Sequence, residues 1–271
     1  LEFAAENRFT RTDIFVALGG GVTGDIAGLA AALYQRGIRY VQVPTTFLAA
    51  IDSSVGGKTA INLIAGKNLA GAFWQPSLVI CDCDTFKTLP DSVFADGTAE
   101  AIKYGMITEL PLFEQFEHGS ISRDLDNIVT SCVNIKRRLV SRDEYDRGAR
   151  QLLNFGHTIG HAIEKLSGYS ISHGNAISIG MVMMSRAAEQ MSMTREPCSK
   201  RLSRALERHG LETECPYKAG ELLEAVLGDK KRSGDEITLV ILTRPGKCRL
   251  HTVPTGDIER ILELGLKRGD E

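Results

Sequence analysis

The sequence predicts an α/β domain followed by a mainly α-helical domain that carries a small β-hairpin. Three observations support this fold class. Up to Pro90, apolar runs that suit buried strands alternate with helical stretches, which is typical of a parallel sheet covered by helices. After Pro90 the sequence is helical over most of its length, and near its end two β-rich runs flank a Pro-Gly pair. We therefore predict domains at 1–90 and 91–271.

The α/β domain contains three candidate strands. IFVAL at 14–18 stops at three glycines, and the small-residue stretch after them predicts a helix ending at Gly37. YVQVP at 40–44 and SLVICDC at 77–83 are predicted to be two further buried strands. The residues from about 47 to 72 are predicted to be helical. Strands that alternate with helices in this way indicate a parallel sheet.

The second domain is predicted to consist mainly of helices. Helical sequence occurs near 97–116, 124–141, 151–167, 174–193, 196–209 and 219–228. The exception is ITLVILTRPGKCRLHTV at 237–253, where two β-rich runs around a Pro-Gly turn predict a hairpin.

The first domain is expected to be truncated at its start. The chain opens at Leu1 without a methionine and runs through LEFAAENRFTRTD as if a helix had been entered midway. Three strands also make a thin sheet. We therefore expect a longer native protein, whose earlier segment completes the sheet.

Composition and charge argue against several classes of protein. The 271 residues, 43% hydrophobic and 24% charged, are typical of a globular protein. Lys and Arg number 32 against 34 Asp and Glu, so no overall charge attracts nucleic acid or an acidic membrane surface. There is no apolar run of about eighteen residues and no secretory signal. The cysteines lack CxxC pairs and disulfide-type spacing. We expect a cytoplasmic protein that binds neither nucleic acid nor membranes.

The glycine-rich stretch ALGGGVTGD is a candidate binding turn. Gly19, Gly21 and Gly24 match GxGxxG between a strand and a helix, the context of a dinucleotide fingerprint. Glycines let the backbone approach a pyrophosphate, and the helix N-terminus offers free N–H groups. The acidic residue expected about 20 residues further on is absent, because the next strand ends in the Pro-Thr-Thr of 44–46. Nucleotide or phosphate binding in a Rossmann-like domain and a purely structural turn both stay open.

A second glycine cluster, VGGKTAINLIAGKN, carries Lys58 and Lys67. Its GGKT fragment lacks the first glycine that a P-loop requires six residues before the lysine. A P-loop is therefore disfavoured. Two solvated lysines at helix ends explain the cluster as well as a phosphate site does.

Two histidines four residues apart stand in LNFGHTIGHAIE. The apolar residues around them recur at near-helical intervals, so His157 and His161 should project from one side of a helix, about one turn apart. This geometry can hold a metal, but it does not show which histidine binds it or whether either does. The motif lacks the glutamate of HExxH, which disfavours a peptidase.

Glu100 and His173 extend the set of possible metal ligands. Glu100 lies three residues before Lys103 in TAEAIKYG, where a surface ion pair is the usual explanation, and His173 begins an apolar helix, where capping or packing is the usual role. Together with His157 and His161 they make four candidates for the three places of a zinc-type site that keeps one position open. Several basic residues in apolar helical sequence suit an anionic substrate: Lys103, Lys136, Arg150, Lys230 and Lys231.

In their order along the chain, these motifs resemble those of the 3-dehydroquinate synthase family. The resemblance covers almost the whole chain and rests on GGGVTGDIAG, VPTTFLAAIDSSVGGKTAIN, GKNLAGAFWQP, AEAIKYG, DEYDRGARQLLNFGHTIGHAIE, HGNAISIGM and DKK. It implies a cytosolic, homodimeric lyase of the shikimate pathway, with an N-terminal NAD-binding domain and a C-terminal helical domain that holds zinc or cobalt. Such an enzyme converts 3-deoxy-D-arabino-heptulosonate 7-phosphate into 3-dehydroquinate and phosphate.

The resemblance also implies individual roles. The metal ligands correspond to Glu100, His157 and His173, whereas His161 faces the substrate. Residues implied to contact NAD are Gly21, Val22, Thr23, Gly24, Asp25, Thr45, Thr46, Lys58, Lys67, Thr85, Phe86, Lys87 and Thr88. Residues implied to contact the substrate phosphate are Lys58, Asn68, Asn154 and Lys230.

Further residues are implied to act on the rest of the substrate. Lys136 and Arg150 match contacts to its carboxylate, which a planar guanidinium can bind with two hydrogen bonds. Lys103 and Asp52 match groups near the reacting hydroxyls, and Arg36 matches a residue that reaches the neighbouring subunit. The implied reaction starts with hydride transfer to NAD, after which phosphate is eliminated, the ketone is reduced again and an aldol step closes the ring.

Three other functions compete with this one. A related sugar-phosphate cyclase such as 2-deoxy-scyllo-inosose synthase acts on a substrate without a carboxylate, which Lys136 and Arg150 disfavour. A metal-dependent polyol dehydrogenase shares the glycine turn but does not need so many phosphate contacts. A non-catalytic module would not need the complete set of acid, histidine and lysine residues.

Overall fold

The computed structural model describes residues 1–64, 66–230 and 234–267. Two compact units make up the chain: the first contains Leu1–Gly97 and Leu125–Tyr145, the second Thr98–Asp124 and Asp146–Glu271. Helices α3 (Asp91–Thr108) and α5 (Ile121–Arg142) each contribute residues to both units. The first unit is α/β and the second is mainly helical with a hairpin. The domain boundaries at 1–90 and 91–271 stay a prediction.

The first unit is built on a three-stranded parallel sheet. Strands β1 (Ile14–Gly19), β2 (Arg39–Pro44) and β5 (Leu78–Val79) lie in the order β1-β2-β5. All three predicted strands are present, although only two residues of the 77–83 stretch pair in the sheet. The prediction that this stretch is buried is wrong, because Leu78 is 53% exposed. Strand β2 is the central strand, because its Val41 pairs with Val16 of β1 on one side and with Leu78 of β5 on the other.

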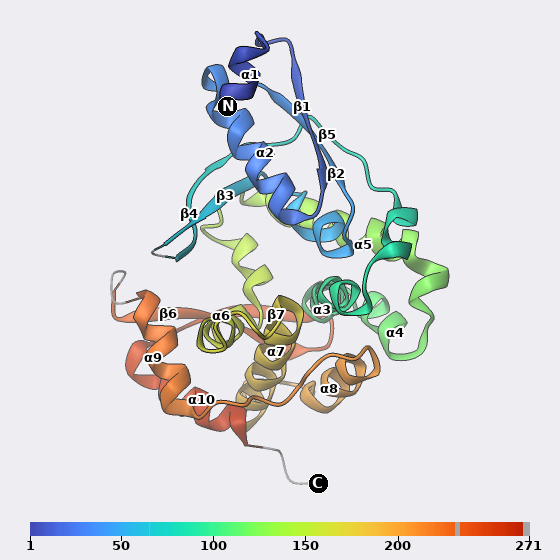
Figure 1. Cartoon of the computed structure of the whole chain (residues 1–271). Helices are drawn as coiled ribbons and strands as arrows, with labels where there is room; N and C mark the ends of the chain where they lie inside the picture. The colour runs from blue at the N-terminus through green and yellow to red at the C-terminus, as the bar shows by residue number, and fades with distance from the viewer. Residues whose placement is uncertain (65, 231–233, 268–271) are drawn as a thin grey trace. The chain divides into compact units, whose positions relative to one another are not determined.

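Helix α2 (Gly21–Leu33) follows β1 directly and packs on one face of the sheet (Figure 1). Its small residues allow this approach, because a side chain at Gly24 would collide with Gln42 on β2. The other face of β1 is apolar and open in the described structure, with Val16 63% and Leu18 66% exposed. Parallel sheets normally carry cover on both faces.

The prediction of helix from about 47 to 72 is wrong over most of that range. A short π-helical turn, η2 (Ala49–Ser53), is followed by an antiparallel hairpin of β3 (Lys58–Leu63) and β4 (Gly66–Phe73). A glycine of β4 permits the close pairing of the two strands, since a side chain at Gly71 would meet the backbone of β3. Apolar sequence interrupted by glycine suits either element, and the cross-strand backbone bonds decide between them.

The remaining short elements of the first unit are α1 (Glu2–Glu6), η1 (Tyr34–Arg36) and η3 (Cys83–Thr88). The side chain of Asp82 caps η3 by accepting a hydrogen bond from the backbone N–H of Asp84.

The second unit is a helical assembly around α7 (His173–Gln190), which is buried along most of its length. The other helices are α4 (Leu110–His118), α6 (His157–Leu166), α8 (Ser199–Arg208), α9 (Ala219–Lys230) and α10 (Ile258–Leu266). Helices α6 and α7 lie side by side (Figure 1), and glycines at their contact let the two backbones approach closely. None of the helices in the described part of the chain has the length and apolar character needed to cross a membrane.

Two predicted helices of this unit are broken in the structure. The stretch at 151–167 is divided into η4 (Ala149–Asn154) and α6, because Gly156 adopts the left-handed region with φ of 79°. The stretch at 97–116 is divided between α3 and α4, and Pro111 lies in the first turn of the second helix, where proline is favoured.

The C-terminal hairpin is present as predicted. Strands β6 (Glu236–Arg244) and β7 (Lys247–Pro254) pair antiparallel around Pro245 and Gly246. A short turn, η5 (Thr255–Asp257), then leads into α10. The hairpin contacts η4, the segment that precedes the two histidines of α6.

Candidate metal centre and substrate-binding residues

Glu100, His157 and His173 come together inside the second unit. They lie on α3, at the first position of α6 and at the first position of α7. Oε1 of Glu100 is 3.3 Å from Nε2 of both histidines, and the candidate ligand atoms of the three residues all lie within 4.8 Å of one another. A carboxylate oxygen and two imidazole nitrogens suit zinc or cobalt, and three protein ligands leave one coordination position open. The donor set therefore fits a divalent metal ion.

The backbone around His157 prepares its ring for this role. The left-handed turn at Gly156 ends η4 and makes His157 the first residue of α6. Nδ1 of His157 lies 3.1 Å from the carbonyl oxygen of Phe155. If this nitrogen carries the proton and donates it to the carbonyl, Nε2 presents a lone pair toward Glu100.

Lys103 forms a buried ion pair with Glu100. Nζ of Lys103 contacts Oε2 of Glu100, and both side chains are almost completely buried, at 2% and 0% exposure. Burial by itself raises the pKa of Glu100, but the ammonium of Lys103 and the adjacent His157 outweigh this effect and hold the pKa well below its ordinary value. The carboxylate is therefore anionic at neutral pH. The surface ion pair that the spacing alone suggested is excluded.

The two ligand histidines differ in their electrostatic surroundings. Burial and the nearby Lys103 lower the pKa of His157, which keeps its imidazole neutral. Burial also lowers the pKa of His173, but interactions with Glu100 and Glu164 outweigh it and raise the pKa to about 10. A metal ion that binds here must therefore displace the proton of His173.

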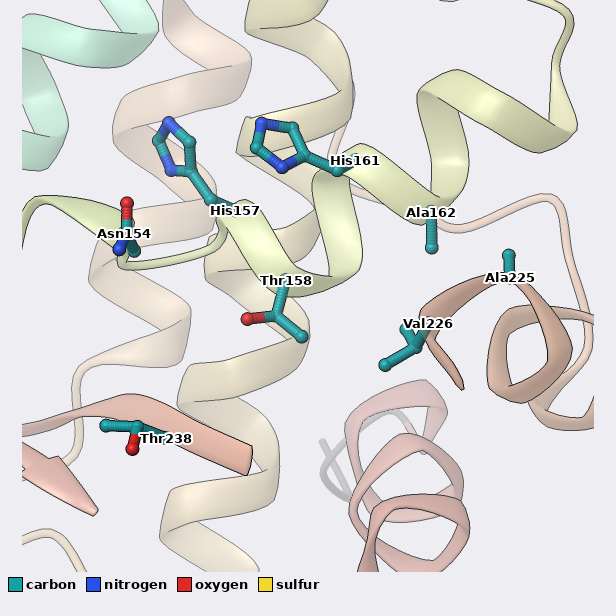
Figure 2. Close-up of a pocket in the computed structure, with 8 residues that line it drawn as sticks. All are labelled: Asn154, His157, Thr158, His161, Ala162, Ala225, Val226 and Thr238. Carbon is teal, nitrogen blue, oxygen red and sulfur yellow. The ribbon is translucent and has the colours of Figure 1, made fainter. Parts of the chain in front are cut away.

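His161 lies beside the three residues but is not one of them. Its ring centroid is 5.3 Å from that of His157, one turn earlier on α6, and its side chain is 58% exposed. His157 and His161 project from the same side of α6 and line a pocket of about 220 Å³ (Figure 2). The other lining residues are Asn154, Thr158, Ala162, Ala225, Val226 and Thr238. The exposed imidazole of His161 can therefore reach a bound molecule that a buried ligand cannot.

The first unit brings a second group of predicted residues together. Asp25, Lys58 and Asn68 line a pocket of about 360 Å³ beside the β3–β4 hairpin. Nζ of Lys136 donates to Oδ1 of Asp52 at 2.5 Å. Burial raises the pKa of Asp25 to about 6, although Lys136 opposes the rise and Asp52 adds to it.

The predicted NAD contacts occupy several elements of the first unit. Gly21, Val22, Thr23, Gly24 and Asp25 open α2, and the first intrahelical bond runs from the N–H of Gly24 to the carbonyl of Gly20, so the N–H groups of the residues before Gly24 have no helical partner. Thr45 and Thr46 follow β2, and the backbone N–H of Thr45 bonds to the carbonyl of Gly19. Lys67 lies on β4, and η3 carries Thr85, Phe86, Lys87 and Thr88.

Two of the predicted NAD contacts have other partners in the structure. Phe86 is 3% exposed and packs its ring against that of Phe47, at a centroid distance of 6.0 Å. Lys87 is exposed and pairs with Asp84. Phe86 therefore serves the core of the first unit, and Lys87 belongs to a local surface ion pair.

The remaining predicted residues are placed as follows. Arg150 lies in η4 and is 2% exposed, and Asn154 ends the same segment beside the pocket of His157 and His161. Arg36 ends η1 at a left-handed backbone position. Lys230 ends α9, but its side chain and the residue Lys231 lie outside the described part of the structure.

Sequence reasoning missed one acidic residue at the metal centre. Glu164 on α6 is buried, and its carboxylate lies 3.6 Å from Nδ1 of His173 and 4.0 Å from Nε2 of His161. The signal was its helical spacing, three residues after His161 and seven after His157, which places the three on one face.

Known proteins match the chain along most of its length. Residues 1–96 match the family described as 3-dehydroquinate synthase N-terminal, and residues 97–232 match the family described as 3-dehydroquinate synthase C-terminal. The 3-dehydroquinate synthase of Clostridium perfringens (strain 13 / Type A) is 44% identical over 246 residues, covering 89% of this chain and 70% of the relative. That of Streptococcus suis (strain 05ZYH33) is 42% identical over 270 residues, covering 97% and 76%.

Solved structures of sugar-phosphate cyclases share the fold. A crystal structure of 2-deoxy-scyllo-inosose synthase, complexed with carbaglucose-6-phosphate, NAD+ and Co2+, has a TM-score of 0.85 and 29% identity, covering 97% of this chain and 77% of that one. The 2-epi-5-epi-valiolone synthase of Streptomyces hygroscopicus subsp. jinggangensis 5008, with NAD+ and Zn2+ bound, has a TM-score of 0.86, 24% identity and coverage of 96% and 76%. Both halves of the chain match the family, and the two relatives are identical to it at more than two fifths of the aligned positions, so the chain belongs to the 3-dehydroquinate synthase family.

Proposed function

We propose that this protein catalyses the NAD- and metal-dependent conversion of 3-deoxy-D-arabino-heptulosonate 7-phosphate into 3-dehydroquinate and phosphate. One observation carries the proposal: a buried carboxylate and two imidazoles from three helices converge, beside a buried lysine, in a chain 44% identical to a 3-dehydroquinate synthase. When bound, the metal ion stabilises negative charge on a substrate hydroxyl oxygen, and NAD accepts and returns a hydride.

Glu100, His157 and His173 are proposed to hold the metal ion. Lys103 supports this arrangement, because its ammonium keeps Glu100 ionised in a buried place. His161 is proposed to move a proton at the substrate. Its side chain is more than half exposed and lies one turn from a metal ligand, so its imidazole can exchange a proton with a bound hydroxyl.

Charged and polar residues are proposed to bind the anionic ends of the substrate. Lys58 and Asn68, which line one pocket of the first unit, are proposed to contact its phosphate. The family resemblance assigns the same role to Asn154, which lines a pocket of the second unit, and to Lys230. Arg150 and Lys136 are proposed to bind the carboxylate. Asp52 holds Lys136 through its carboxylate, which fixes the direction of the ammonium.

The glycine turn at the start of α2 is proposed to bind the pyrophosphate of NAD, since the N-terminus of this helix directly follows β1 and offers N–H groups without helical partners. We also propose that the protein works in the cytoplasm as a homodimer, with Arg36 reaching the site of the other subunit. The remaining predicted NAD contacts, among them Thr45, Thr46, Lys67, Thr85 and Thr88, belong to the same proposal.

Phosphate release tests the proposed function. The protein, purified at its full native length, is loaded with zinc or cobalt, supplied with NAD, and given either the keto sugar acid phosphate or glucose 6-phosphate. Release only with the keto sugar acid phosphate, and its loss when metal or NAD is withheld, is the expected result. Turnover of glucose 6-phosphate would favour a cyclase like 2-deoxy-scyllo-inosose synthase instead. Tight metal binding without turnover of either compound would favour a non-catalytic module.

A further inference from the structure

Glu164 has no part in the function proposed above, yet it lies against the metal centre. Among the residues whose side chains the structure describes, the buried acidic residues are Glu100 and Glu164. Both contact His173, from opposite nitrogens of its ring: Glu100 lies 3.3 Å from Nε2, and Glu164 lies 3.6 Å from Nδ1. The ring of His173 therefore stands between two buried carboxylates.

Glu164 can supply a negative charge beside a bound metal ion that Glu100 does not supply. The negative charge of Glu100 is matched by the ammonium of Lys103, with which it forms a buried ion pair. The two imidazoles are neutral when they bind a metal, so the three ligands together with Lys103 carry no net negative charge. Burying a divalent cation without a compensating anion is costly. Glu164 is the second buried carboxylate beside His173.

Ring orientation gives Glu164 a second task. A metal-binding histidine usually donates the N–H of its other nitrogen to a carboxylate or carbonyl, which fixes its tautomer and direction. For His157 the carbonyl of Phe155 occupies this position, at 3.1 Å from Nδ1. For His173 the corresponding group is the carboxylate of Glu164.

We propose that Glu164 is a positioning residue of the metal centre, which orients His173 through Nδ1 and supplies the negative charge that a divalent ion needs there. Its second oxygen, Oε2, lies 4.0 Å from Nε2 of His161. The same carboxylate thus lies near one proposed metal ligand and near the proposed proton-transfer residue.

This inference rests on the proposed metal site, and metal affinity separates the two. Zinc affinity of the full chain is measured by competition with a chromophoric chelator, for the wild type, Glu164→Gln and Glu189→Gln. Glu189 is a matched control, because it is a partly buried carboxylate of the same unit that binds the backbone N–H groups of Cys198 and Ser199. Failure of the wild type to bind zinc would overturn the proposed function itself.

Glu164→Gln keeps the shape and the acceptor oxygen but removes the charge. We expect about 10-fold to 100-fold weaker zinc binding, while Glu189→Gln stays within about 2-fold of the wild type. The metal-free Glu164→Gln protein should melt at a lower temperature than the wild type, because it loses the interaction of the Glu164 carboxylate with the protonated His173, so zinc affinity is compared at a temperature where both proteins are folded. Zinc affinity equal to the wild type would overturn the inference, whether or not the melting temperature changed.

A measurement on the wild type avoids any loss of folding in the variant. Long-range proton–nitrogen correlation spectra of the zinc-loaded protein report which nitrogen of His173 carries a proton. A proton on Nδ1, with Nε2 shifted by the metal, is the expected result. A proton on Nε2 would overturn the inference, since Nδ1 of His173 would then have no hydrogen to donate to the carboxylate of Glu164.

Discussion

Replacing His157 by alanine should weaken metal binding strongly, whereas replacing His161 should leave it almost unchanged, although the two residues lie one turn apart on α6. Nε2 of His157 is 3.3 Å from Oε1 of Glu100 and belongs to the group of three candidate ligands. His161 stands outside that group, with a side chain 58% exposed. His157→Ala therefore removes a ligand, whereas His161→Ala removes a neighbour.

The expected magnitudes follow from these positions. Four-ligand structural zinc sites are worth roughly 10–16 kcal/mol, so one ligand contributes about 3 kcal/mol. His157→Ala should thus weaken zinc binding by about 100-fold, since 1.4 kcal/mol corresponds to a factor of ten. His161→Ala should change zinc affinity by less than about 3-fold while slowing turnover about 100-fold, as expected for loss of a proton-transfer group.

Chelator competition on both variants, followed by phosphate release with saturating zinc, separates the two effects. Equal loss of zinc affinity in both variants would refute the division between a metal ligand and a substrate-facing histidine. Unfolding temperatures of the metal-free proteins serve as the control, because His157 is partly buried and its removal leaves a small void.

Two further predictions concern stability. Burial raises the pKa of Asp25 from its ordinary value of 3.8 to about 6. Between these two pH values the folded protein keeps a proton on Asp25 that the unfolded protein has released. The free energy of unfolding therefore falls as the pH rises from 3.8 to 6. Asp25→Asn should therefore increase the free energy of unfolding by about 1 kcal/mol at pH 7.5, after allowance for partial exposure, and by much less at pH 4.5. Denaturant titrations that give equal increases at both pH values would refute this. Gly156→Ala should destabilise by about 3 kcal/mol or more, because its left-handed backbone disfavours a side chain and a Cβ would meet the backbone of Met181. Gly168→Ala, which is also left-handed but has nothing within 4 Å, should cost only about 1 kcal/mol; equal losses in thermal unfolding would show that close packing at Gly156 is unimportant.

Much of the fold could be predicted, because hydrophobic periodicity reports regular and locally determined elements. The strands β1 and β2, the helix α2 and the hairpin of β6 and β7 all appear near the expected residues. The β3–β4 hairpin was missed, because its apolar residues separated by glycines also fit a small-residue helix, and only pairing across the hairpin distinguishes the two. The break at Gly156 was missed for a similar reason, since a glycine inside a helical pattern can equally be an interior residue.

The residues of the metal centre could not be grouped from local sequence spacing alone. Spacing placed His157 and His161 on one helix face correctly, yet the structure groups His157 with Glu100 and His173, which come from other helices. Contacts between residues more than fifty positions apart in the chain depend on tertiary packing, which periodicity does not report. The family resemblance selected these three residues, and their roles stay predictions until a metal is observed. Glu164 was overlooked, because its importance depends on the approach of α7.

Diffraction from crystals grown with zinc, recorded on both sides of the zinc absorption edge, tests the proposed metal centre most directly. The account predicts one strong anomalous peak in the second unit, about 2.0–2.2 Å from a carboxylate oxygen of Glu100 and from Nε2 of both His157 and His173. A peak bonded to His161 in place of His173, or no peak near Glu100, would contradict it.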